Sequence, residues 1–317
     1  GVPDARPGLP RLPGVGIQQR PGDLINVFGI EPFPAYRYVP AGFVLNAPTV
    51  ADSSDWRPQL PPVIARYAPP YAKKLVALQH QKAVFKRGDS ALVVLAYDTK
   101  DAPEMTNSPL RAGLVVSPVG DDPKDYKVVT EGLKRSDVLT VRAPWGPLLM
   151  SAEVAAPANK ALARARYGVG PLSGPRARVE LSDLLFFKAY GALPASVEDA
   201  APHALTTERV RASDKLGVYW EAYGTDPRGE KMRVSLIVDR VSPDEGGFFR
   251  RLVGGRGRAP VSVSIDDISA LGRTTSSRGL EVDISTLSRG AYIVQLEIEV
   301  AGQPRLRAEH RIEVTGQ

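Results

Sequence analysis

Short stretches of alternating apolar and polar residues recur along most of the chain from residue 72 onward. Each stretch is bounded by Gly, Pro, Asp or Asn, which favour turns. Examples are AVFKRGDSALVVLAYDTK at 83–100 and KMRVSLIVDR at 231–240. Short strands at this spacing are typical of β-sandwiches and predict an all-β fold with two tandem immunoglobulin-like β-sandwich domains. The segment 69–82 alone suggests a helix, leading into the first domain, and the polar segment 196–204 is expected to be a loop.

Proline divides the chain into three parts, which we expect to be an N-terminal arm (1–71), a first sandwich (72–170) and a second sandwich (171–317). The arm holds 14 of the 29 prolines, and proline excludes regular helix or central strand over most of it. Disordered linkers are poor in large apolar residues, yet this arm is rich in them. We therefore predict an extended arm whose aromatic side chains pack on the chain's own domains or bind a partner protein: Phe28, Phe33, Tyr36, Tyr38, Phe43 and Trp56.

The two predicted sandwiches resemble each other in sequence. VVLAYDTKD at 93–101 parallels VYWEAYGTD at 218–226, and the segment 148–169 parallels 292–314. Each of the latter two segments has a strand with a carboxylate, Glu153 or Glu297, then a turn and a basic strand. This order predicts that one sandwich has been duplicated.

Glu221 is framed by Tyr219, Trp220 and Tyr223, a setting that could suit a sugar-cleaving acid. Strand alternation places Trp220 in the core and directs Glu221 and both tyrosines to the opposite face. Glycosidases need a second carboxylate nearby, and the sequence marks none. We therefore interpret Glu221 as a solvated residue on the outer face of a strand. Separately, the spacing of Leu287, Gly290 and Tyr292 predicts a tyrosine corner, in which the phenol bonds back to the preceding connection.

Composition narrows the chemistry that the chain can perform. It has no cysteine, which excludes disulfides, thiol catalysis and the common zinc sites. The three histidines are far apart, and G-x-S-x-G is absent. Two acidic clusters are interpreted as surface turns, with calcium as the alternative: Asp98, Asp101 and Glu104, and Asp121, Asp122 and Asp125. We expect no catalytic residue, no metal site and no cofactor.

The net charge of +6 is spread along the chain, with one dense basic segment at 248–260. Spread charge indicates a solvated surface, or weak attraction to anionic lipid or an acidic partner. No nucleic-acid-binding motif is present, so a nucleic-acid partner is not expected. The basic segment is either a solvated loop or a contact with an anionic membrane surface or acidic partner, made by Phe248, Phe249, Arg250, Arg251, Arg256 and Arg258.

Several strands also resemble a known family. ARVELSDLLFF (177–187), LGVYWEAYG (216–224) and RGAYIVQLEIEV (289–300) are similar to secreted bacterial proteins of the GWxTD-domain type, and AVFKRGDSALVVLAYD (83–98) is similar to their first module. The signature itself is echoed only by Tyr-Gly-Thr-Asp at 223–226. The resemblance implies paired β-sandwich modules and export, and brings no established catalytic residue.

Together these patterns predict an exported, non-catalytic structural subunit in the periplasm or at the cell surface. It would dock through its arm and sandwich surfaces on a larger, membrane-associated protein complex. The alternative function is a carbohydrate- or cell-wall-binding module, which needs exposed aromatic side chains on one sandwich face. Tyr219 and Tyr223 are the candidates for that surface.

Overall fold

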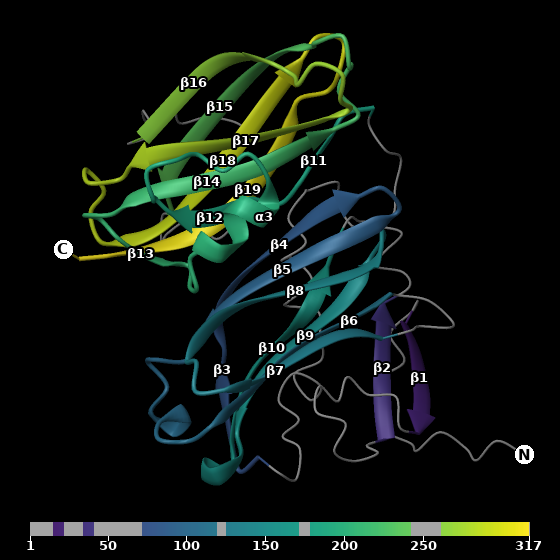
Figure 1. The fold of residues 1–317 in the computed structure, drawn as a ribbon, viewed down its shortest axis with the longest axis vertical. Helices are drawn as coiled ribbons and strands as arrows, with labels where there is room; N and C mark the ends of the chain where they lie inside the picture. The colour runs from purple at the N-terminus through teal and green to yellow at the C-terminus, as the bar shows by residue number, and fades with distance from the viewer. Residues whose placement is uncertain are drawn as a thin grey trace, which may run out of the picture.

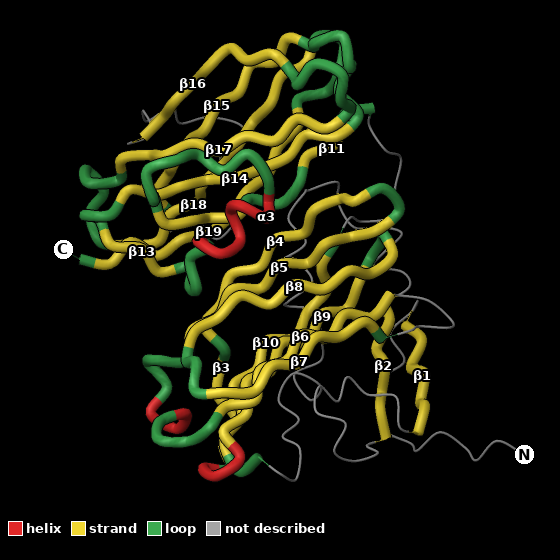
Figure 2. The backbone as a smooth tube through the Cα atoms, viewed as in Figure 1, coloured by secondary structure: helices red, strands yellow, loops and turns green. Residues whose placement is uncertain are grey.

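Strands make up nearly all of the regular structure in the computed structural model of this chain (Figures 1 and 2). The structure describes residues 15–21, 34–40, 72–118, 125–170, 178–241 and 261–316. Within these ranges it describes the side chains from residue 72 onward, except that of Tyr167. Strands β3 to β10 form one sandwich and β11 to β19 a second, confirming the all-β prediction. Both are visible in Figure 1, with the second above the first.

The first sandwich packs a five-stranded sheet on a three-stranded sheet. Leu114, Met150 and Ala163 of the larger sheet meet Val93 and Leu95 of the smaller one, all almost fully buried. The larger sheet has the order β3 (Lys74–Ala77), β10 (Ala161–Val169), β9 (Leu148–Ala156), β6 (Leu110–Pro118), β7 (Tyr126–Gly132), and the smaller one β4 (Gln79–Arg87), β5 (Ser90–Asp98), β8 (Ser136–Pro144). Short 3-10 turns η2 (Pro103–Met105) and η3 (Pro157–Asn159) connect strands.

The second sandwich repeats this plan around a core centred on Trp220, which is 1% exposed. Its larger sheet has the order β13 (Arg209–Arg211), β19 (Leu306–Thr315), β18 (Gly290–Val300), β15 (Lys231–Arg240), β16 (Val261–Ile268). Its smaller sheet joins β11 (Glu180–Leu181), β12 (Leu185–Lys188) and β17 (Thr275–Asp283) to the central strand β14 (Lys215–Tyr223).

The duplication predicted from sequence is present in the topology. In both larger sheets the first strand runs parallel to the last, β3 with β10 and β13 with β19, and the next pairs are antiparallel. Central strands β5 and β14 correspond, with Leu95 and Trp220 both facing their cores. If Leu95 and Trp220 are equivalent, the next residues are equivalent too, so the counterpart of Glu221 is Ala96. The Ala-Tyr pairs at 96–97 and 222–223 are therefore one residue out of structural register.

The tyrosine corner is confirmed. The Tyr292 hydroxyl donates to the Ser288 carbonyl oxygen at 2.9 Å, and the side chain is 2% exposed. We expect Tyr292→Phe to lower the free energy of unfolding by about 1 kcal/mol, because one buried hydrogen bond is lost while the ring still fills its space. Chemical denaturation followed by circular dichroism measures this loss; an unchanged midpoint would show that the corner does not stabilise the sandwich.

Two local predictions were wrong. The described part of 69–82 is not helical: it forms β3 and the start of β4, because both segments find strand partners in β10 and β5. The expected loop at 196–204 contains helix α3 (Val197–Ala200) followed by the 3-10 turn η4 (Ala201–His203). Ser196 and Asp199 form a reciprocal capping box that starts this helix, and Val197 and Ala200 anchor its apolar side.

Within the arm, the structure describes one antiparallel hairpin of β1 (Val15–Pro21) and β2 (Pro34–Pro40). Both ends of β2 and one end of β1 are prolines, which tolerate such edge positions because they need donate no hydrogen bond there. Tyr36 and Tyr38 lie in β2, opposite Gln19 and Ile17.

Candidate functional site: the interface between the sandwiches

The outward faces of the two smaller sheets pack against each other. Ala83 and Phe85 of β4 and Val94 and Ala96 of β5 join side chains of the second sandwich in one buried apolar cluster. Helix α3 lies against the same cluster, at the junction of the two sandwiches in Figure 1. The second sandwich contributes Leu185, Phe187, Val197, Ala200, Ala201, Ala204 and Tyr219.

Glu221 lies at the polar centre of this interface. Its Oε2 accepts a hydrogen bond from Nη1 of Arg87 at 2.6 Å, and its Oε1 accepts one from Nη2 at 2.9 Å. The Tyr219 hydroxyl donates to Oε1 at 2.7 Å and the Tyr223 hydroxyl donates to Oε2 at 2.8 Å. Both carboxylate oxygens therefore have two donors, and a planar guanidinium meets the carboxylate in the bidentate geometry that favours strong pairing.

The prediction that Glu221 is solvated is wrong. The predicted alternation is present, because Trp220 faces the core and Glu221 faces the other way. Glu221 is nevertheless only 3% exposed, because the first sandwich covers the face to which it points. A carboxylate with both oxygens engaged and no solvent access is poorly placed to donate a proton to a substrate, so the geometry supports a structural role.

The environment of Glu221 keeps Arg87 charged and Tyr219 and Tyr223 protonated. Burial alone would lower the pKa of the Arg87 guanidinium, but the hydrogen bond and the negative charge of Glu221 outweigh it and raise that pKa. Burial raises the pKa of the Tyr219 and Tyr223 hydroxyls, and the charge of Glu221 raises both further. Arg87 thus stays cationic and both phenols stay protonated as donors.

Basic residues of β4 meet acidic residues of the second sandwich at three points of the contact. Lys82 Nζ lies 2.6 Å from Asp183 Oδ2, and Lys86 Nζ lies 2.8 Å from Glu180 Oε2. Arg87 Nη2 is also 3.8 Å from Glu198 Oε2 at the exposed rim. With Arg87 and Glu221, these pairs form a row of complementary charge in which the first sandwich is basic and the second acidic.

The same contact satisfies the free backbone edge of β4. The backbone N–H of Val84 donates to Asp183 Oδ2 at 3.1 Å, and that of Lys86 donates to the Tyr223 hydroxyl at 2.8 Å. The buried Gln81 amide donates to the carbonyl oxygens of Phe186 and Leu205 at 2.7 and 2.6 Å, and accepts from the Phe186 N–H at 3.0 Å. An edge strand that would otherwise expose unpaired groups is covered.

Gly217 allows this packing. It lies opposite Phe187 in the β12–β14 pair, and a Cβ at Gly217 would lie 2.4 Å from a carbon of the Phe187 ring. Because that ring is fully buried in the interface, it has no room to move aside. We expect Gly217→Ala to destabilise the protein by about 1–3 kcal/mol through overpacking. Gly146→Ala, where the added carbon meets open space, is the matched control; equal unfolding midpoints would contradict the prediction.

Alkaline pH should weaken the protein. Burial, with a contribution from Asp137, raises the pKa of Tyr97 from 10.0 to about 12, and the pKa values of Tyr219 and Tyr223 are raised as well. Above pH 10 the folded chain therefore holds more protons than the unfolded chain, so the free energy of unfolding falls as pH rises. Denaturant unfolding below and above pH 10 measures this slope, which should be shallower in Tyr97→Phe between pH 10 and 12.

Most residues predicted to bind a partner lie outside the described part of the chain: Phe28, Phe33, Phe43, Trp56, Phe248, Phe249, Arg250, Arg251, Arg256 and Arg258. Tyr36 and Tyr38 are placed on β2 as backbone positions. Tyr219 and Tyr223, the proposed sugar-binding surface, are 0% and 5% exposed. They cannot form that surface, because they pack between the sandwiches.

Among the described residues, no group of three or more acidic or histidine side chains is arranged to hold a metal ion. His203 stacks on Tyr190 with 3.7 Å between the ring centroids, and His310 packs on Phe186. Asp101 pairs with Arg209 across the interface at 3.5 Å.

None of the helices in the described ranges is long and apolar enough to cross a bilayer.

Sequence reasoning missed the interface residues Gln81, Lys82, Lys86, Glu180 and Asp183. The available signal was the unbroken apolar run of β5, LVVLAY at 92–97. Strands covered on both faces lose their polar alternation, whereas β15 alternates cleanly because one of its faces is open. The run therefore indicated that a second layer covers this sheet.

Comparison with family models and with curated proteins gives no match. Among solved structures, the crystal structure of red sea bream transglutaminase aligns with 12% identity and a TM-score of 0.25. The alignment covers 75% of this chain and 32% of that one. This likeness is too weak to carry a functional argument.

Proposed function

We propose that this chain is a non-catalytic structural subunit, exported to the periplasm or cell surface, that docks on a larger membrane-associated protein complex. The observation that supports it is the interface itself. Tandem domains generally move relative to each other unless their interface is large and apolar. Here an apolar cluster, buried charge pairs and shared hydrogen bonds join the two sandwiches. The two sandwiches are therefore already ordered relative to each other, and binding a partner would cost little further conformational entropy.

The interface also bears on the competing functions. Glu221, the carboxylate framed by aromatic residues, is enclosed and fully hydrogen-bonded, which disfavours glycoside hydrolysis. The two tyrosines that would have served a carbohydrate-binding module are buried with it. The non-catalytic scaffold is therefore the function that the described residues favour.

A pull-down from membranes with a C-terminal tag tests the proposal. The full chain should retain a defined set of membrane proteins after a salt wash, and a chain lacking residues 1–60 should lose them. A chain with Arg250, Arg251, Arg256 and Arg258 replaced by Ser separates the contribution of the basic loop. Unfolding midpoints of all three chains control for loss of fold. Recovery of the full chain alone at low salt would refute the scaffold role.

A further inference from the structure

The outward face of the larger sheet in the first sandwich is buried. Alternating with the core residues of β6, β9 and β10, the side chains of Val115, Ala155 and Leu162 point away from the core and form a separate apolar cluster with Ala72. Their exposed fractions are 2%, 4%, 0% and 6%. A sheet face that points to solvent normally carries polar residues. This face, here called the β9 outer face, is apolar and buried, so it is covered.

Charged groups on the β9 outer face are buried as deeply. Glu153 is 1% exposed, and its Oε1 accepts hydrogen bonds from Arg164 Nε at 2.7 Å and Arg166 Nη2 at 3.1 Å. The side chains of both arginines are 5% exposed. Within the described residues, Glu153 Oε2 has no hydrogen-bond partner. Removing a carboxylate and two guanidinium groups from water costs several kcal/mol, so the cover must supply both apolar surface and polar partners.

The second sandwich provides an internal comparison. Glu297 is the counterpart of Glu153 and pairs with Arg305 at 3.1 Å. There the glutamate side chain is 16% exposed and the arginine 58%, and neighbouring Arg307 is 40% exposed. The corresponding glutamate and its arginine partner are thus partly or largely exposed in the second sandwich and buried in the first. The difference is a feature of the first sandwich, not of the fold.

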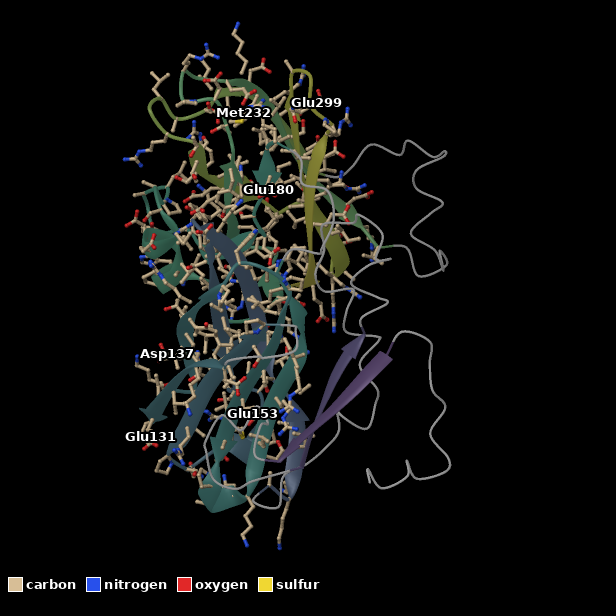
Figure 3. All side chains as sticks on the ribbon, turned by 90° about the vertical axis from the view of Figure 1, so that its right-hand side faces the viewer. Glu131, Asp137, Glu153, Glu180, Met232 and Glu299 are labelled. Carbon is tan, nitrogen blue, oxygen red and sulfur yellow. The ribbon has the colours of Figure 1, made fainter. Side chains whose placement is uncertain are left out.

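The continuous described stretch 72–118 begins on the β9 outer face. Ala72 belongs to its apolar cluster, and the backbone N–H groups of Lys73 and Lys74 donate to the Lys160 carbonyl oxygen at 2.7 and 3.1 Å. The N-terminal 71 residues are therefore joined to the described stretch at this face. In both Figure 1 and Figure 3 the β1–β2 hairpin lies beside the first sandwich, where Figure 3 labels Glu153.

Among the described residues from 72 onward, no strand or helix lies over the β9 outer face, because the second sandwich packs on the opposite, smaller sheet. The neighbouring segments outside the description, 119–124 and 171–177, have six and seven residues, and the longer segment 242–260 joins β15 to β16 in the second sandwich. Five strands about 4.8 Å apart are too wide for such short connections to cover.

We propose that the N-terminal arm, residues 1–71, is the cover of the β9 outer face and closes it as a third layer on the first sandwich. The arm has the aromatic and aliphatic side chains that an apolar face needs, and backbone N–H groups and hydroxyls that can satisfy Glu153. A proline-rich chain loses less conformational entropy when it is ordered in this way. The inference does not rest on the proposed function: a partner would meet the arm as part of a preformed surface.

Cysteine probes test whether the face is covered, since the chain has no cysteine of its own. Val115→Cys places a thiol at the centre of the β9 outer face. Ile237→Cys is the matched control, because Ile237 occupies the corresponding position of β15 and is partly exposed. In the folded full chain, we expect maleimide to modify Val115→Cys at least about ten-fold more slowly than Ile237→Cys. Equal rates would overturn the proposal.

Photo-crosslinking identifies the cover. Leu149→p-benzoylphenylalanine places a crosslinker at the partly buried rim of the cluster, in an equal mixture of light and isotopically heavy full chains. Crosslinks to residues 1–71 within one isotopic form are expected. Mixed light–heavy crosslinks would show that a second copy covers the face, and crosslinks to 119–124, 171–177 or 242–260 would show another segment there; each result overturns the proposal. The pull-down result is independent, so the two proposals can fail separately.

Discussion

Replacing Glu221 with Ala is expected to lower the free energy of unfolding by about 3 kcal/mol, at the lower end of the loss found when one partner of a buried ion pair is removed. The Arg87 guanidinium would keep its charge but lose both of its short hydrogen bonds to the carboxylate. The Tyr219 and Tyr223 hydroxyls would lose their acceptor at the same time. Because the side chain of Arg87 is 21% exposed, water partly compensates, which keeps the loss from being larger.

Glu198 supplies the control for this experiment. It also faces Arg87, at 3.8 Å, but its side chain is 59% exposed, and exposed pairs contribute about 0–1 kcal/mol. Guanidinium denaturation of Glu221→Ala and Glu198→Ala should therefore give clearly different midpoints. If the two variants are equally stable, the buried pair does not hold the sandwiches together. Combining Arg87→Met with Glu221→Leu should recover part of the loss, since no unpaired charge remains.

Replacing Trp220 with Ala is expected to cost about 3–5 kcal/mol, the usual range for removing a buried aromatic side chain from a core. Trp220 is the largest fully buried side chain among the described residues and contacts the core of the second sandwich. Since single domains are stable by about 5–15 kcal/mol, this one change could remove much of the stability of that sandwich. Near-ultraviolet circular dichroism and denaturant titration measure the loss.

Two further variants show whether the Trp220 effect comes from the core. Trp220→Phe keeps most of the apolar volume and should lose much less stability than Trp220→Ala. Leu271→Ala removes an apolar side chain that is 72% exposed, and should change stability by within about 0.5 kcal/mol. A loss for Trp220→Ala as small as that for Leu271→Ala would contradict the packing described for this strand.

Glu221 and its neighbours also affect how cooperatively the two sandwiches unfold in denaturant. Because the interface joins the sandwiches, unfolding of one exposes apolar and charged surface on the other. The Glu221→Ala variant is thus expected to broaden or split the unfolding transition if the sandwiches then unfold separately.

Local patterns in the sequence determined the all-β class, the strand that contains Trp220, the tyrosine corner and the duplication. These features follow from the two-residue side-chain period, from turn residues, and from a hydrogen bond between residues four positions apart. They are short-range properties, and for that reason one sequence suffices to predict them. The helix expected at 69–82 does not form, because pairing with the distant strand β10 and with the following strand β5 outweighs a weak local helical preference.

Only the tertiary structure decided which strand faces are covered. Alternation directs Glu221 and Trp220 to opposite faces, but it cannot say whether a face meets water or another sandwich. That outcome depends on how β4 and β14, more than 120 residues apart, come together through Arg87 and Glu221. The same holds for Glu153 and Glu297, which occupy equivalent positions yet differ in exposure. Burial is set by long-range packing, so it is a property of the assembled fold rather than of any local stretch of sequence.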